Sequence, residues 1–122
     1  MNIVADLLLG IAAVIHLLPA VGVLGTPRLE RLYGIGVTGP DLAILMRHRA
    51  VLLGLLGVLL FAAIWDDELR PAAMAGGLVS DIAFLAITAS HRGFNAEMRR
   101  VVLADVVSVV ALVAAAVVIA VG

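Results

Sequence analysis

The chain has 122 residues, of which 64% are hydrophobic and 14% charged, and its mean hydropathy is +1.21. A water-soluble domain of ordinary composition is about half apolar and about a quarter charged, so these figures exclude that class. The absence of cysteine excludes disulfides, thiolate metal sites and cysteine nucleophiles. The formal net charge of −1 gives no basis for a nucleic-acid partner.

Four apolar segments follow one another along the chain, and each is bounded by turn or capping residues. The first ends at Gly25-Thr26-Pro27, and as a helix it would be about 33 Å long. The second begins after Gly39-Pro40 with Asp41 as its cap, and the third opens with Pro71, a residue favoured in a first helical turn. The predicted helices are 3–24, 41–64, 71–90 and 97–121.

These lengths suit a hydrocarbon core of about 30 Å. The fourth segment is rich in valine and alanine, but in a bilayer every backbone group must be bonded within its own segment, which favours a helix over a strand. We therefore predict an all-α fold in which residues 1–122 form one integral membrane domain, a four-helix transmembrane bundle. Segment 3–24 has no basic leader and carries Asp6 and His16, so we expect a mature helix and not a cleaved signal peptide.

All eight basic residues are arginine, and their distribution predicts an orientation. Seven of them lie in or beside the first and third connections, whereas the second connection holds only Arg70 among Asp66, Asp67 and Glu68. By the positive-inside rule the first and third connections are cytoplasmic, and both termini lie on the outer side.

Each predicted helix carries an ionisable residue inside the span, which is costly and marks a candidate functional site. Counted from the predicted cytoplasmic ends, His16, Arg49, Asp81 and Asp105 are eight or nine residues deep. At 1.5 Å per residue they share one level, about 12 to 14 Å from that end. We interpret this coincidence as the strongest functional signal in the sequence and expect these four residues to be catalytic.

Further polar and aromatic residues are expected to bind substrate near this level. Arg47 and Arg49 point about 160° apart on a helix, and Arg49 is the better candidate to face the interior while Arg47 reaches headgroups. The predicted substrate-binding residues are Arg47, His48, Phe84, Thr88 and Ser108.

Two carboxylates, a guanidinium and an imidazole in one apolar pocket can activate water or move a proton, with Arg49 stabilising a developing oxyanion. This predicts a membrane-embedded hydrolase or isomerase that opens an epoxide or isomerises a lipophilic small molecule. A proton-coupled transporter would use the same residue types as a relay. A third alternative is a structural subunit in which an ion pair of Asp81 or Asp105 with Arg49 only fixes helix register.

No metal and no cofactor are expected, because His16, His48 and the two aspartates lack a metal-binding spacing motif. The expected partners are the lipid bilayer, a lipophilic substrate and further copies of the chain, since closely spaced glycines and alanines suit helix packing within or between protomers.

The layout resembles the small bacterial membrane proteins grouped loosely as DoxX-like. Residues 16–19 (His-Leu-Leu-Pro), 28–34 (Arg-Leu-Glu-Arg-Leu-Tyr-Gly) and 47–52 (Arg-His-Arg-Ala-Val-Leu) are similar to segments of short actinobacterial proteins of this kind. The resemblance covers almost the whole chain. It implies a multi-pass protein of the bacterial cytoplasmic (inner) membrane and transfers no activity.

Arg49-Ala50 also resembles the Arg-Ala of the second helix in the membrane-associated eicosanoid and glutathione metabolism family, which has four helices and outer termini. That family continues with Asn, Glu and Pro, whereas Leu53, Leu56 and Val58 stand in this neighbourhood. The residues expected to grip glutathione are therefore missing, and a glutathione-transferase-like protein is an alternative only.

Overall fold

A computed structural model describes residues 2–122. Within this range the chain forms five α-helices and one 3₁₀ segment, and no strand. Four spans are long and apolar enough to cross a membrane, as predicted: Ile3–Leu24, Pro40–Ala62, Arg70–Ala89 and Ala96–Val121. Only 17% to 28% of each apolar stretch is buried inside the fold, so most of these side chains are at least partly exposed. Such a surface indicates a membrane protein.

The first span consists of two parts with different helical geometry. Helix α1 (Ile3–Leu17) continues directly into the 3₁₀ segment η1 (Leu18–Leu24). Pro19 lacks an amide hydrogen and its ring clashes with the preceding turn, which explains why regular α-helical bonding stops beside it. The Asn2 side chain caps α1 by accepting from the amides of Val4 and Ala5.

The first connection contains a short helix that was not predicted. Helix α2 (Thr26–Tyr33) has Pro27 in its first turn and ends at Gly34, whose φ of 66° is left-handed and suits glycine. The prediction of four helices is therefore confirmed for the membrane-spanning elements, and α2 is a fifth helix beside them.

The remaining helices begin close to their predicted positions. Helix α3 (Pro40–Ala62) has Gly39 at its N-cap, so the prediction that Asp41 is the cap was wrong; Asp41 lies in the first turn. Helix α4 (Arg70–Ala89) starts one residue before Pro71. Helix α5 (Ala96–Val121) is capped by Asn95, whose side-chain oxygen accepts from the Met98 amide at 2.7 Å.

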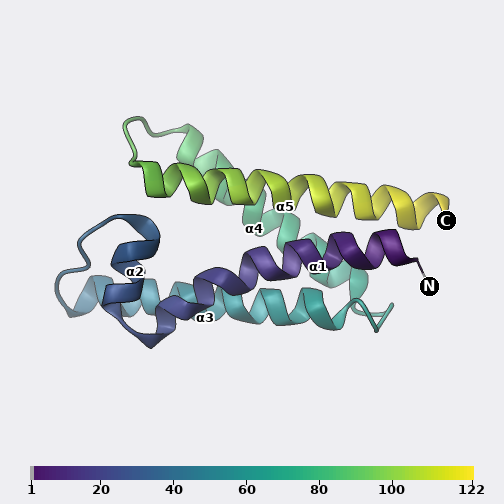
Figure 1. Cartoon of the computed structure of the whole chain (residues 1–122), viewed down its shortest axis with the longest axis horizontal. Helices are drawn as coiled ribbons and strands as arrows, with labels where there is room; N and C mark the ends of the chain where they lie inside the picture. Colours follow the sequence, from purple (N-terminus) through teal and green to yellow (C-terminus); the bar gives the residue numbers. More distant parts are fainter. Residues whose placement is uncertain (1) are drawn as a thin grey trace.

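Helix α1 packs against both α3 and α5, and α4 lies against α5 on the far side of the view in Figure 1. Both chain ends lie at the same end of the bundle, and the first and third connections lie at the other (Figure 1). Near the termini the core is wholly apolar, with Leu9, Leu60 and Leu112 fully buried at its centre. A smaller apolar cluster around Leu29 and Tyr33 joins α2 to α3 and α5 at the other end.

Candidate functional site

A buried pair of ionisable side chains joins α1 to α4 in the middle of the bundle. His16 Nε2 lies 2.9 Å from Asp81 Oδ1, and each side chain is only 2% exposed. The ring nitrogen does not point straight at the oxygen, so the contact is an ion pair by distance and a bent hydrogen bond at most. The fold thus brings His16 and Asp81 into direct contact. Their common depth in the sequence could not reveal that these two residues are partners.

The other ring nitrogen fixes where the protons of this pair lie. His16 Nδ1 is 2.7 Å from the Ala12 carbonyl oxygen, which can only accept, so Nδ1 carries a hydrogen and donates. A hydrogen bond between Nε2 and Asp81 Oδ1 requires one further proton, as imidazolium with carboxylate or as neutral imidazole with carboxylic acid. The pair is therefore suited to hold one transferable proton in an apolar interior.

A cavity of about 320 Å³ opens beside this pair. His16, Arg49 and Asp105 lie in its wall with Ser80 and Phe84, and the rest of its lining is apolar. Asp105 is only partly buried, and its carboxylate interacts electrostatically with Asp81, His16 and Arg49. The structure thus places all four residues predicted to be catalytic at one site, one from each membrane-spanning segment.

Arg49 is held by aromatic rings and not by a carboxylate. Its Nη1 donates to the Tyr33 hydroxyl, and its guanidinium carbon lies 5.2 Å from the Tyr33 ring centre and 5.5 Å from that of Phe84. These distances are within the range of cation–π attraction. The ion pairs found in residues 2–122 do not include Arg49, so the predicted ion pair of Arg49 with Asp81 or Asp105 is not formed; the structural-subunit alternative stays a prediction.

Tyr33 is a site residue that the sequence reasoning missed. Its side chain is 3% exposed, and this burial raises its pKa above the ordinary 10.0, while the Arg49 guanidinium acts in the opposite direction. Asn95 Nδ2 donates to the carbonyls of Tyr33 and Gly34 at 2.9 and 3.0 Å, which ties the end of α2 to the start of α5. The start and stop signals at Pro27 and Gly34 were the available clues to α2.

Two predicted substrate-binding residues lie away from the cavity. Arg47 is exposed and its Nε donates to the Val23 carbonyl at 3.0 Å, as expected from its opposite phase to Arg49. His48 is exposed too, and both line a separate surface hollow with Val23, Pro40 and Val51.

The other three predicted binding residues lie on α4 and α5. Phe84 is in the cavity wall, whereas Thr88 Oγ1 donates to the Leu85 carbonyl at 3.0 Å within its own helix. Ser108 is fully buried. Gly77 faces Leu112 so closely that an added Cβ would lie 2.9 Å from Leu112 Cδ1. Helices α4 and α5 are antiparallel, so one helical turn further along from Gly77 and Leu112, Asp81 lies opposite Ser108.

Two oxygens in this region, Asp81 Oδ2 and Ser108 Oγ, are buried without a hydrogen-bond partner among residues 2–122. Unpaired buried polar atoms are rare and costly, so they mark a place where stability is not the only requirement. No group of three or more His, Asp or Glu side chains in the same residues is arranged to hold a metal ion.

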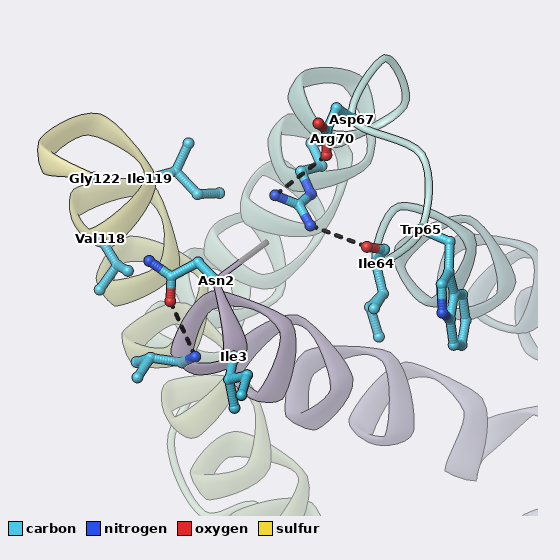
Figure 2. A pocket seen from close by; sticks show the side chains of 10 residues that line it. Asn2, Ile3, Ile64, Trp65, Asp67, Arg70, Val118, Ile119 and Gly122 are labelled. Atoms are coloured by element: carbon cyan, nitrogen blue, oxygen red, sulfur yellow. Dashed lines mark hydrogen bonds and ion pairs between the residues drawn. The ribbon is translucent and has the colours of Figure 1, made fainter.

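A second polar cluster lies at the end of the bundle that carries the termini (Figure 2). Arg70 Nη2 is 2.8 Å from Asp6 Oδ1, Nη1 is 3.4 Å from Asp67, and Arg70 also donates to the Ala63 and Ile64 carbonyls at the end of α3. An opening of about 770 Å³ adjoins it, between the chain ends and Trp65. The charged groups of this second cluster are already paired with one another. We therefore place the functional site at the cavity beside His16 and Asp81.

No family model, curated protein or solved structure matches this chain significantly.

Proposed function

We propose that the protein is a membrane-embedded enzyme that performs acid–base chemistry on a lipophilic small molecule, either opening an epoxide by hydrolysis or isomerising a double bond. The observation that carries this proposal is the buried His16–Asp81 pair, whose histidine lies in the wall of a mostly apolar cavity. An apolar pocket with few convergent polar groups is typical of a site for a small lipophilic molecule.

Each polar group has a role that follows from its surroundings. The His16–Asp81 pair gives a proton to the substrate oxygen or carbon, and the Asp105 carboxylate, at the cavity wall, activates water or removes a proton. Arg49 cannot lose its proton, so it stabilises the negative charge that develops on the substrate oxygen. Tyr33 and Phe84 are positioning residues, because they hold the Arg49 guanidinium.

The packing beyond the pair favours an enzyme over the alternative of a proton-coupled transporter. A relay across the bundle requires polar groups along its whole length. Between His16–Asp81 and the Asp6–Arg70 pair lies the apolar core centred on Leu9, Leu60 and Leu112. The polar groups of the site therefore lie on one side of this core only, which suits a site that admits substrate from one side.

We further propose that this end is cytoplasmic, that the termini face the outer side of a bacterial inner membrane, and that the chain assembles with copies of itself. The arginine distribution supports the orientation. The predicted resemblance to DoxX-like proteins supports a location in the bacterial inner membrane.

The experiment is a turnover assay of the purified protein in neutral detergent with a long-chain terminal epoxide and a β,γ-unsaturated ketone. General acid–base groups contribute about 10² to 10⁴ in rate, so His16→Gln and Asp105→Asn are expected to lower turnover by at least about a hundredfold. Asp66→Asn, which removes a carboxylate from the exposed loop before α4, is the matched control and should retain full activity. Equal turnover by all three variants would contradict the assignment.

A further inference from the structure

A second cavity, of about 280 Å³, adjoins the candidate site on the side of α2. The two cavities share Ile15, Pro19, Val101 and Asp105 in their walls, so they adjoin one another. The 3₁₀ geometry of η1 begins beside Pro19, at the boundary between them. A ligand chain that passes Pro19 from the second cavity would reach the cavity that His16 lines.

The polar residues that line the second cavity are two arginines from different helices, together with Glu97 and Asp105. Arg31 of α2 and Arg100 of α5 both line it, and neither belongs to an ion pair found in residues 2–122. Glu97 also lines it, but its carboxylate is turned toward Gly34, where an added Cβ would lie 2.7 Å from Glu97 Cδ. Two cations without carboxylate partners thus border one opening.

Apolar side chains form the rest of the second cavity, namely Leu18, Leu32 and Ala104 beside the shared residues. Its lining therefore changes from cationic near Arg100 to apolar, and Asp105 stands where it meets the candidate site. These two residues are five positions apart on α5, which corresponds to about 7.5 Å along the helix axis. A molecule that matches this order has an anionic head, a hydrocarbon stem and a reactive group several carbons away.

From this order we propose that the substrate is an amphiphile with an anionic head group, a carboxylate or a phosphate, which Arg31 and Arg100 bind while its chain runs past Pro19 into the inner cavity. This inference rests on the proposed function and specifies its substrate class. Arginine suits the role because its planar guanidinium donates two parallel hydrogen bonds to a carboxylate or phosphate.

The test measures binding of simple probes by isothermal titration calorimetry in neutral detergent. Dodecanoate and dodecyl phosphate are compared with dodecanol and dodecyltrimethylammonium, which share the chain and differ in the head. A hydrogen bond to a charged group corresponds to about a tenfold change in affinity or more. We therefore expect the two anionic probes to bind at least about tenfold more tightly than the neutral and cationic ones. Equal affinity for dodecanol would overturn the proposal.

A pair of double variants locates the head group. Arg31→Gln with Arg100→Gln should weaken dodecanoate binding by about a hundredfold, one factor of about ten for each arginine. All four arginines are exposed, but Arg28 and Arg99 do not line the cavity, so Arg28→Gln with Arg99→Gln removes the same charge from the same two helices and should leave affinity within about threefold. If both double variants bind alike, the arginines at the cavity do not hold the head group and the proposal fails.

Two sources of the anion are distinguished by repeating the titration in nanodiscs of phosphatidylcholine with and without phosphatidylglycerol. If phosphatidylglycerol weakens dodecanoate binding to the parent protein, a membrane phospholipid supplies the head group. If the affinity is unchanged, the source is a free acid or phosphate ester. Both results support an anionic head, provided that the variant with Arg31→Gln and Arg100→Gln has lost its tight binding of dodecanoate.

Failure of this inference can be told apart from failure of the proposed function. His16→Gln should still bind dodecanoate, because His16 does not line the cavity with the two arginines. Turnover that depends on His16, without preference for anionic probes, would overturn the inference alone. Binding of anionic probes without any effect of His16 on turnover would overturn the proposed chemistry instead.

Discussion

His16 and Asp81 have different consequences for stability from those of Asp105, although all three are ionisable groups at one level of the bundle. Nε2 of His16 lies 2.9 Å from Oδ1 of Asp81, and the Ala12 carbonyl accepts from the other ring nitrogen. Asp105 lies in the cavity wall without an ion-pair partner among residues 2–122 and interacts electrostatically with Asp81. Residues kept for function are commonly retained at a cost in stability, and Asp105 fits that description.

Replacing Asp105 with asparagine is therefore expected to leave the thermal unfolding midpoint unchanged or to raise it. Asp81→Leu should lower it strongly, because removing one partner of a buried pair typically costs about 3 to 5 kcal/mol. Both are measured against the parent by circular dichroism in one detergent at one pH. A fall for Asp105→Asn as large as that for Asp81→Leu would assign Asp105 to the support of the fold.

Tyr33 is the only tyrosine, so its ionisation can be followed directly by the ultraviolet absorbance of tyrosinate. Burial raises its pKa above 10.0, and the Arg49 cation partly opposes that rise. We expect a titration midpoint above 10.0 in the folded protein and a still higher one in Arg49→Gln, which lacks the cation. A lower midpoint in Arg49→Gln would contradict the contact between the two side chains.

The raised pKa of Tyr33 also determines how the stability of the fold changes with pH. The folded state binds the Tyr33 proton more tightly than the unfolded state does. The resulting contribution to the free energy of unfolding is fully present below the pKa of Tyr33 in the unfolded state, and it is lost as the pH rises through the pKa in the folded state. The free energy of unfolding should therefore fall with rising pH above about 10, the ordinary tyrosine pKa. Chemical unfolding at several alkaline pH values measures this slope, which should be smaller in Tyr33→Phe.

At the scale of elements, small residues on α3 allow the first span to approach closely. A Cβ at Gly57 would lie 3.0 Å from the Leu17 backbone nitrogen and 2.7 Å from Leu17 Cγ, and one at Gly54 would lie 3.1 Å from Ala20 Cβ. Gly54 and Gly57 are among the closely spaced glycines expected to suit helix packing, and this contact is made within one chain. The contact is made where α1 passes into η1, directly beside the candidate site.

Gly57→Ala is expected to destabilise the fold by about 1 to 3 kcal/mol, the usual cost of overpacking, because the Leu17 backbone cannot move aside without displacing His16. Gly36→Ala is the matched control, since a Cβ there meets nothing within 4 Å. Unfolding in a denaturing detergent, followed by circular dichroism, compares the two. Equal stability of both variants would show that the α1–α3 approach is looser than described.

The sequence predicted the spanning elements well because length and hydropathy alone determine them, as the agreement of all four spans demonstrates. It also predicted the common depth of His16, Arg49, Asp81 and Asp105. The rotation of each helix about its own axis depends on side-chain packing across the bundle. Counting residues along the sequence gives no information on that packing. For that reason the pairing of His16 with Asp81, and the aromatic contacts of Arg49, emerged only from the structure.

At the scale of the whole molecule, the bundle is divided into two unlike halves. The half that carries the termini has an apolar core, and Arg70 contacts Asp6 of α1 and the Ala63 carbonyl just after α3 at its end. The other half contains both cavities, the short helix α2 and all the arginines except Arg70. Since arginine-rich connections face the cytoplasm, this division predicts that the site opens toward the cytoplasmic side.

The lack of cysteine makes that orientation measurable with single introduced thiols. Glu68→Cys lies in the exposed connection before α4, and Arg92→Cys in the exposed connection before α5. In spheroplasts a membrane-impermeant maleimide should label Glu68→Cys at once and Arg92→Cys only after lysis. The reverse pattern would place the arginine-rich half outside, so the anionic head group and the protons exchanged at His16 would then have to arrive from that side.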